Sequence, residues 1–271
     1  MSRETYVLGS SPEELSRLTV QARIIRPITQ RLLVEAGVKK GMRVLDLGCG
    51  AGDSSMLVAD MVGPLGTVIA IDRSQAAIDK AESRAREEGY TQIQFLQNTV
   101  DEFSSEERFD LVMGRYVLIH QLAPADFIRA ARRHIRPGGV LAFHELTSNR
   151  RSHSLPESPL FQRMATLVQS AVTTGFACSD AAGRLVEFFQ GAGLSEPKLF
   201  SETPISGGSD PSLCIWMAEL IRSLMPSILE RGLATAEEIS VETLEERLIY
   251  EVRQMRSQVE IPSQVCAWTR V

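Results

Sequence analysis

The spacing of apolar residues along the chain changes from a helical period to short strand-like runs, and later returns to helices. The first helical pattern covers residues 12–36 and ends before Gly37, and Pro27 predicts that this helix breaks or restarts. We therefore expect an N-terminal helical segment ahead of the first strand. Its apolar positions recur at roughly helical spacing at Leu15, Leu18, Ile25, Ile28, Leu32 and Leu33.

Residues 42–146 alternate between short apolar runs and amphipathic segments. Repeated strand and helix units of this kind predict a parallel sheet with helices on both faces, joined by right-handed crossovers. Ligands bind such sheets beyond the carboxyl ends of the strands. Strands are predicted at 44–47, 67–71, 93–96, 109–113 and, after the Pro137-Gly138-Gly139 turn, 140–146, and helices at 56–62, 75–88 and 124–135.

The alternation of predicted strands and helices stops after Ser148. We interpret the chain as a single α/β domain, in which residues 1–40 form a helical cap, 41–148 the cofactor-binding core, and 149–271 the rest of the sheet with helical insertions that form a lid. The long insertions are residues 149–180 and 204–260. Helices are predicted at 160–174, 181–190, from Pro211 through Ile228, and at 241–255, with strands at 198–202 and 265–270.

Composition and charge narrow the functional classes. The 271-residue chain carries a net charge of -5, begins without an apolar leader and has no stretch near the ~18 continuous apolar residues of a membrane span. Its four cysteines lack CxxC spacing, which argues against a zinc site or a disulfide framework. A cytoplasmic protein that binds neither nucleic acid nor a membrane nor a metal is expected, and Arg129, Arg132, Arg133 and Arg136 are interpreted as a solvated helix face.

The most informative segment is VLDLGCGAGD, residues 44–53, in which a predicted strand enters a turn with glycines at 48, 50 and 52. Glycine lets the backbone wrap closely around a ligand. A dinucleotide-binding turn places a third glycine where this chain has Asp53. A carboxylate there repels a pyrophosphate but not a sulfonium nucleoside, so the sequence favours S-adenosylmethionine over a nicotinamide cofactor.

Two further acids flank this turn. Asp72 ends the strand VIAID, and its carboxylate can accept hydrogen bonds from both ribose hydroxyls, while Ser74 is the more natural N-cap of the next helix. Asp46 lies at the end of the first strand, where it can balance a cationic ammonium or sulfonium group or stabilise the turn.

Four segments, VLDLGCGAG, VIAID, FDLVMGRYVLIHQL and IRPGGVLAFHEL, resemble the successive motifs of the class I S-adenosylmethionine-dependent methyltransferases, particularly the small-molecule group similar to the ubiquinone and menaquinone methyltransferases. The resemblance is strong over residues 40–148. It implies a Rossmann-like, doubly wound, seven-stranded sheet whose last strand is antiparallel, with S-adenosylhomocysteine as the product.

The resemblance also implies roles for individual residues. Asp46, Gly48, Cys49 and Gly50 would cradle the methionyl part of the cofactor, and Asp72 the ribose. Arg73 would pack over the adenine, and Arg115 would line the cofactor or the acceptor pocket. Where the family has an acid after the third strand, this chain has Asn98-Thr99-Val100, so Asn98, Thr99 or the Val100 backbone would contact the adenine edge.

Methyl transfer from a sulfonium is an in-line displacement, and a base is needed only for a protonated acceptor. The candidate bases are His120, after the fourth strand, and His144, in the fifth; a histidine near a strand is more often structural. Tyr6 and Gln21 would close the pocket and Trp216 would line it, although lid or core packing explains them equally well.

The sequence predicts methyl transfer to an O, N or C nucleophile of a small, partly apolar molecule. Two alternatives stay open: a cyclase or regulatory binder that keeps the cofactor on this fold without methylating, and a nicotinamide-dependent oxidoreductase, which Asp53 disfavours. A homodimer through the insertions is compatible with the sequence, which does not require one.

Overall fold

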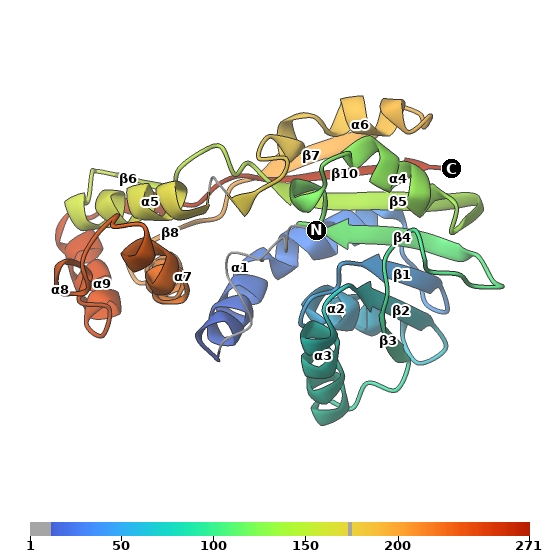
Figure 1. Ribbon diagram of the computed structural model, residues 1–271, viewed down its shortest axis with the longest axis horizontal. Helices are drawn as coiled ribbons and strands as arrows, with labels where there is room; N and C mark the ends of the chain where they lie inside the picture. Colours follow the sequence, from blue (N-terminus) through green and yellow to red (C-terminus); the bar gives the residue numbers. More distant parts are fainter. Residues whose placement is uncertain (1–11, 173–174) are drawn as a thin grey trace. The chain divides into compact units, whose positions relative to one another are not determined.

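The alternating pattern of residues 42–146 folds into a sheet flanked by helices in the computed structural model, which describes residues 12–172 and 175–271 (Figure 1). The chain divides into two compact units. One, here called the sheet unit, comprises Arg26–Thr147, Asp180–Glu202 and Gln264–Val271. The other, here called the helical unit, comprises the described residues before Arg26 together with Ser148–Ser179 and Thr203–Ser263.

The sheet unit contains a seven-stranded sheet, in which β10 runs antiparallel to both of its neighbours. The pairs formed by β1 with β2 and β4, by β2 with β3, and by β4 with β5 are parallel. This arrangement confirms the predicted doubly wound sheet with an antiparallel last strand. In sheet order the strands are β3 (Ile93–Gln97), β2 (Thr67–Asp72), β1 (Arg43–Leu47), β4 (Phe109–Arg115), β5 (Ile135–Leu146), β10 (Gln264–Arg270) and β7 (Lys198–Glu202).

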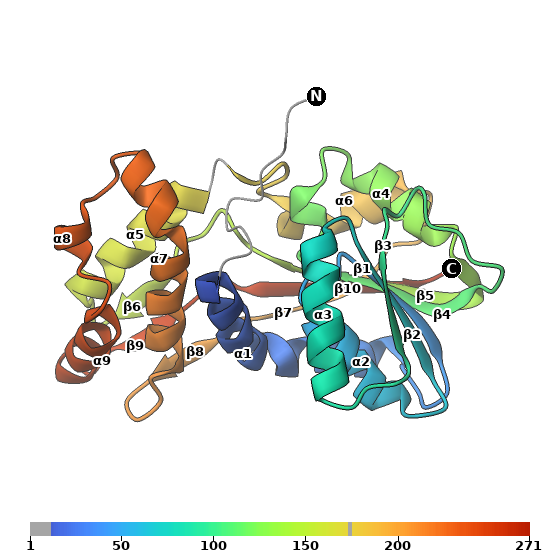
Figure 2. The ribbon, with the colours of Figure 1, turned by 60° about the horizontal axis from the view of Figure 1, so that its bottom comes forward.

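Helices cover both faces of this sheet (Figures 1 and 2). On one face, α1 (Pro12–Ala36) and α2 (Asp53–Val62) pack their apolar residues against the strands, and α3 (Gln75–Glu87) packs beside α2 over β2 and β3. On the other face, Phe127 of α4 (Pro124–Arg132) and Phe189 of α6 (Leu185–Gly191) meet Phe143 of β5 edge to face. Short 3-10 helices, η1 (Leu118–His120) and η3 (Ala181–Gly183), complete this unit.

The helical unit has an apolar core of its own, built mainly by α5 (Pro159–Val172), α7 (Ser212–Glu230) and α9 (Leu244–Gln254). The short helix α8 (Ala236–Ile239) begins with a capping box between Thr235 and Glu238. By length and composition α7 could cross a membrane, but half of its most apolar window is buried in the protein. A small antiparallel sheet, which the sequence did not predict, contains β6 (His153–Leu155), β9 (Gln258–Glu260) and β8 (Ile205–Gly207).

Four element predictions need correction. Helix α1 continues through Pro27, which is exposed, so the ring faces solvent and the helix loses only one backbone hydrogen bond there. Strand β5 begins at Ile135 instead of residue 140, because the Pro137 to Gly139 segment forms an irregularity within the strand, with Gly138 at a φ of 75°. Accordingly α4 ends at Arg132, and the predicted helix 181–190 is divided into η3 and α6.

Candidate functional site

The predicted site residues of the sheet unit gather at one edge of the sheet. Strands β1, β2, β3 and β4 are parallel, so the segments that follow them all leave from their carboxyl ends. The glycine turn follows β1, Asp72 ends β2, Asn98 follows β3, and Arg115 ends β4. Residues that lie up to 69 positions apart in the chain, from Asp46 to Arg115, are therefore neighbours in the fold.

The glycine turn is fastened to the end of β2. Both Gly48 N–H and Cys49 N–H donate to the Ile71 carbonyl, at 2.8 and 3.0 Å. Gly48 and Gly50 adopt positive φ angles of 66° and 53°, which favour glycine. A Cβ built on Gly50 would meet no atom within 4 Å. At Gly50 the turn thus presents bare backbone to open space, as a loop that wraps around a ligand requires.

Asp72 is held by the same turn. Its Oδ2 accepts a hydrogen bond from Gly50 N–H at 3.0 Å, and its Oδ1 accepts one from Ser74 N–H at 2.9 Å. An ionised carboxylate has about four acceptor positions, so each oxygen keeps capacity for a further donor such as a hydroxyl. Ser74 caps α3 by accepting from Ala77 N–H, so Asp72 is not needed as the N-cap, as predicted.

Asp46 is fully buried, and one of its two carboxylate oxygens lacks a protein partner. Oδ2 accepts from the hydroxyls of Ser54 and Ser55 at 2.7 and 2.6 Å, whereas Oδ1 has no hydrogen-bond partner among the described residues. Burial raises the pKa of Asp46, while the two serine hydroxyls and the charge of Arg115 oppose that rise. A buried carboxylate oxygen without a donor beside an open glycine turn fits a cationic or N–H-bearing ligand.

Asp53 does not act as an isolated negative charge. Arg84 of α3 pairs with Asp53 at 2.8 Å and also donates to the Ala51 carbonyl at 2.7 Å. Because the ion pair offsets the carboxylate charge, Asp53 repels a phosphate less than its place in the sequence suggests. The pair instead braces the start of α2 against α3.

The polar side chains that follow β3 form hydrogen bonds within their own segment. Thr99 Oγ1 donates to Glu102 Oε2 at 2.9 Å and accepts from Glu102 N–H at 3.3 Å, so this side chain closes a turn. Asn98 Oδ1 accepts from Thr99 N–H at 2.8 Å. Val100 is buried, and its carbonyl bonds to the ring of His134 at 3.1 Å. Of the three predicted adenine contacts, the half-buried Asn98 retains side-chain amide donors, and Thr99 does not fit the role.

The two candidate bases differ in environment. His144 is fully buried, with Nδ1 3.0 Å from Thr29 Oγ1 and Nε2 3.1 Å from Gln264 Oε1. Since the Gln264 oxygen is an acceptor, Nε2 carries the proton and the Thr29 hydroxyl donates to Nδ1. Burial lowers the pKa of His144 to about 3. With both nitrogens occupied, His144 is a structural residue, which corrects its prediction as a base.

His120 is half-buried and ends η1, directly after β4. Arg73 is exposed just beyond β2. Gln21 and Trp216 belong to the helical unit, where Trp216 is part of the apolar core and its indole N–H has no partner among the described residues. Tyr6 lies outside the described residues.

Glu145 is the site-edge residue to which the sequence analysis gave no role. It is fully buried next to His144 in β5, and its Oε1 accepts from Val117 N–H and Leu118 N–H at 3.0 and 2.7 Å. Burial raises the pKa of Glu145 to about 8. Its place as the penultimate residue of the IRPGGVLAFHEL motif was the signal available in the sequence.

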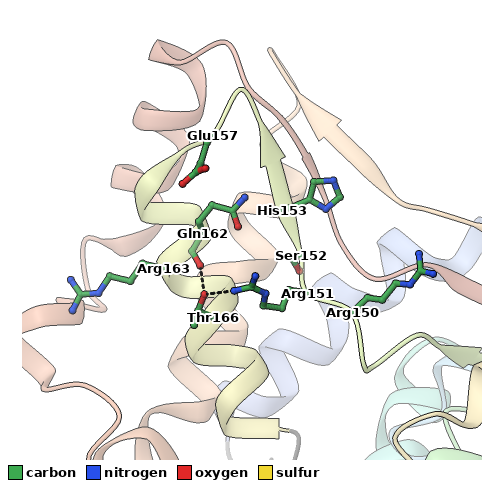
Figure 3. Close-up of a pocket in the computed structure, with 8 residues that line it drawn as sticks. All are labelled: Arg150, Arg151, Ser152, His153, Glu157, Gln162, Arg163 and Thr166. Atoms are coloured by element: carbon green, nitrogen blue, oxygen red, sulfur yellow. Dashed lines mark hydrogen bonds between the residues drawn. The ribbon is translucent and has the colours of Figure 1, made fainter.

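A separate hollow of about 630 Å³ lies in the helical unit, between β6 and α5 (Figure 3). In Figure 3 Arg150 and Arg163 extend in opposite directions, and Arg151 instead turns toward Thr166, to which it donates at 3.1 Å. Arg163 Nη2 lies 3.6 Å from Glu238 Oε2. Because its arginine side chains point in different directions, this hollow does not bring them together on one ligand.

The sheet topology and the glycine turn with its acids define the fold of the class I S-adenosylmethionine-dependent methyltransferases. The chain belongs to the methyltransferase-domain family, whose model matches residues 38–182. It is similar to the ubiquinone biosynthesis O-methyltransferases of Roseobacter denitrificans, at 34% identity over 42% of this chain and 45% of that protein, and of Alkalilimnicola ehrlichii, at 36% over 43% and 47%. The match thus spans under half the length of these curated relatives.

Solved structures share the fold. Phosphoethanolamine N-methyltransferase 2 of Haemonchus contortus, in complex with S-adenosylhomocysteine, aligns with a TM-score of 0.54 at 18% identity, over 89% of this chain and 52% of that one. The [4+2]-cyclase SpnF aligns with a TM-score of 0.53 at 20% identity, over 89% and 80%. These likenesses establish the architecture.

Proposed function

We propose that the protein transfers the methyl group of S-adenosylmethionine to an O, N or C nucleophile of a small, partly apolar molecule. The observation that carries the proposal is the buried Asp46 Oδ1, which has no partner among the described residues and lies beside a glycine turn that is open at Gly50. An ammonium group of the cofactor would supply the missing donor. A phosphate would not.

The remaining edge residues suit the rest of the same cofactor. Asp72 would accept hydrogen bonds from the ribose hydroxyls with the capacity left on each oxygen. The Arg115 guanidinium, whose charge acts on Asp46, would pair with the cofactor carboxylate. Asn98 would donate to an acceptor nitrogen of the adenine, and Arg73 would cover the ring.

The cofactor, when bound, would supply a methyl group on a sulfonium: the acceptor atom would bond to the methyl carbon as the carbon–sulfur bond breaks, leaving a neutral thioether. A protonated acceptor would also have to lose its proton. His120, at the carboxyl end of β4, would take that proton from a phenol or an amine. The protein otherwise contributes alignment and exclusion of water.

One observation supports a partly apolar acceptor. The curated relatives named above are ubiquinone biosynthesis O-methyltransferases, which favours a phenolic acceptor for this chain. The proposed partners are this acceptor and the cofactor, and the proposed location is the cytoplasm. We propose that the protein binds neither nucleic acid nor a membrane. A homodimer stays a prediction.

The test is mass spectrometry of a panel of phenols, catechols and apolar amines incubated with the protein and S-adenosylmethionine. A mass gain of one methylene unit on a phenol is expected, and His120→Gln should lower its turnover about 100-fold while S-adenosylhomocysteine still binds. Binding of S-adenosylhomocysteine without methylation of any panel member would instead favour a cyclase or regulatory binder on this fold.

A further inference from the structure

The turn after β4 is held in a conformation that its own sequence does not favour. Tyr116 has a φ of 57°, an angle that is uncommon for a residue other than glycine. Its N–H donates to the His144 carbonyl at 2.8 Å, and its hydroxyl donates to Gln264 Oε1 at 2.5 Å. The next two N–H groups, of Val117 and Leu118, both donate to Glu145 Oε1. Strands β5 and β10 thus determine the path of this turn.

Val117 joins the turn to the glycine turn after β1. A Cβ built on Gly48 would lie 3.1 Å from Val117 Cγ2, and one built on Gly114 would lie 2.5 Å from Val117 Cγ1. The valine methyl groups therefore fill the space that two glycines leave, and Leu47 and Gly114 are direct neighbours in the β1 and β4 register. A shift of Val117 would leave Gly48 unsupported.

We infer that Glu145 is a positioning residue for cofactor binding, which holds Val117 against Gly48 and so keeps the glycine turn in its ligand-binding shape. Glu145 has no direct part in methyl transfer. It acts as a hydrogen-bond acceptor: one oxygen, Oε1, receives both the Val117 and the Leu118 N–H groups, in either protonation state of the carboxyl group.

If Glu145 acts as a hydrogen-bond acceptor, two substitutions of similar size should have different effects. Glu145→Gln keeps an oxygen for the Val117 and Leu118 N–H groups, whereas Glu145→Met leaves both N–H groups buried without an acceptor. Isothermal titration with S-adenosylhomocysteine should give near-wild-type affinity for Glu145→Gln and about tenfold weaker affinity for Glu145→Met. In the ligand-free protein, the Gly48 amide signal in a ¹⁵N-correlation spectrum should move in Glu145→Met and stay in place in Glu145→Gln.

Leu141→Ala is the matched control, because Leu141 is fully buried in the same strand and pairs with Val112 and Thr269, away from the turn. It should lower the melting temperature but leave S-adenosylhomocysteine affinity and the Gly48 signal unchanged. Val117→Ala provides a second route if Glu145→Met does not fold, and it should weaken binding several-fold.

Three results would overturn the inference. One is wild-type affinity in Glu145→Met or, if that variant does not fold, in Val117→Ala. Another is a loss of affinity in Glu145→Gln as large as in Glu145→Met, because the acceptor would then not be the relevant property. The third is an equal loss in Leu141→Ala, which would mean that any destabilisation of β5 weakens binding.

Discussion

At the scale of single residues, the carboxyl edge of the sheet contains groups whose burial and hydrogen bonding differ sharply. Asp72 is half-buried and keeps acceptor capacity, whereas His144 has both ring nitrogens occupied. Which residues can bind a ligand is therefore decided by the partners they already have.

Asp72→Asn tests the ribose contact. The variant keeps one acceptor oxygen and replaces the other by an amide NH₂, which cannot accept from the facing backbone N–H or from a ribose hydroxyl. S-adenosylhomocysteine affinity should therefore fall about 10-fold to 100-fold in a calorimetric titration. Asp79→Asn is the matched control, since Asp79 is exposed on α3 and its Oδ1 accepts from the Gln75 side chain at 2.7 Å, within the same helix. Equal losses in both variants would contradict the assignment of Asp72.

Glu145 and His144 predict opposite effects of pH on stability. Folding raises the pKa of Glu145 from 4.5 to about 8, so its contribution to stability is full below pH 4.5 and is lost as pH rises to about 8. Folding lowers the pKa of His144 from 6.5 to about 3, so its contribution is full above pH 6.5 and is lost as pH falls to about 3.

Between pH 6.5 and 8 only Glu145, of these two groups, should make stability fall as pH rises. Urea unfolding across this window should show the decline in the wild type and a flatter profile in Glu145→Gln. An unchanged slope in Glu145→Gln would show that another group titrates there.

At the scale of elements, the first turn after β1 and the helix after it use neighbouring glycines for different purposes. Gly50 faces open space, whereas a Cβ on Gly52 would lie 3.1 Å from Ala81 of α3 and 3.2 Å from Phe95 of β3, so Gly52 allows the start of α2 to pack closely against both. Gly50 therefore serves ligand binding, and Gly52 serves helix packing.

The same substitution at these two positions should therefore have different consequences. Gly50→Ala should cost about 1 kcal/mol of folding free energy through its positive φ and weaken S-adenosylhomocysteine binding about tenfold or more. Gly52→Ala adds a clash with α3 and should cost about 2 to 4 kcal/mol in chemical denaturation, with a smaller effect on affinity in the folded protein. The reverse order of the two effects would contradict the account.

The elements that the sequence predicted correctly are those specified by local signals. The glycine turn, the acid that ends β2 and the strands of the core are each specified by a short stretch of neighbouring residues. The errors at the site involve distant partners: His144 is occupied by Thr29 and Gln264, which lie 115 and 120 positions away, and Asp53 is paired with Arg84, 31 positions away. The small sheet of β6, β9 and β8 joins strands of three residues, too short to show a period.

At the scale of the whole molecule, the two units have separate cores, and each contains one of the two tryptophans. Trp216 lies in the core of the helical unit and Trp268 in that of the sheet unit. A ligand that binds only one folded unit stabilises that unit by mass action.

Single-tryptophan variants should distinguish the units. In Trp216→Phe, the thermal transition seen by fluorescence reports Trp268, and saturating S-adenosylhomocysteine should raise its midpoint. In Trp268→Phe, the fluorescence reports Trp216, and the same ligand should raise the midpoint of its thermal transition less. Equal shifts in both variants would show that the protein unfolds as one cooperative body, contrary to this prediction.

The central claim is that the glycine turn after β1, with Asp46 and Asp72, binds a sulfonium nucleoside and not a dinucleotide. The most direct measurement is a pair of calorimetric titrations of the full chain, one with S-adenosylhomocysteine and one with NAD⁺. We predict saturable binding of S-adenosylhomocysteine with one ligand per chain and no heat from NAD⁺. Saturable binding of NAD⁺, with none of S-adenosylhomocysteine at millimolar concentration, would contradict the account.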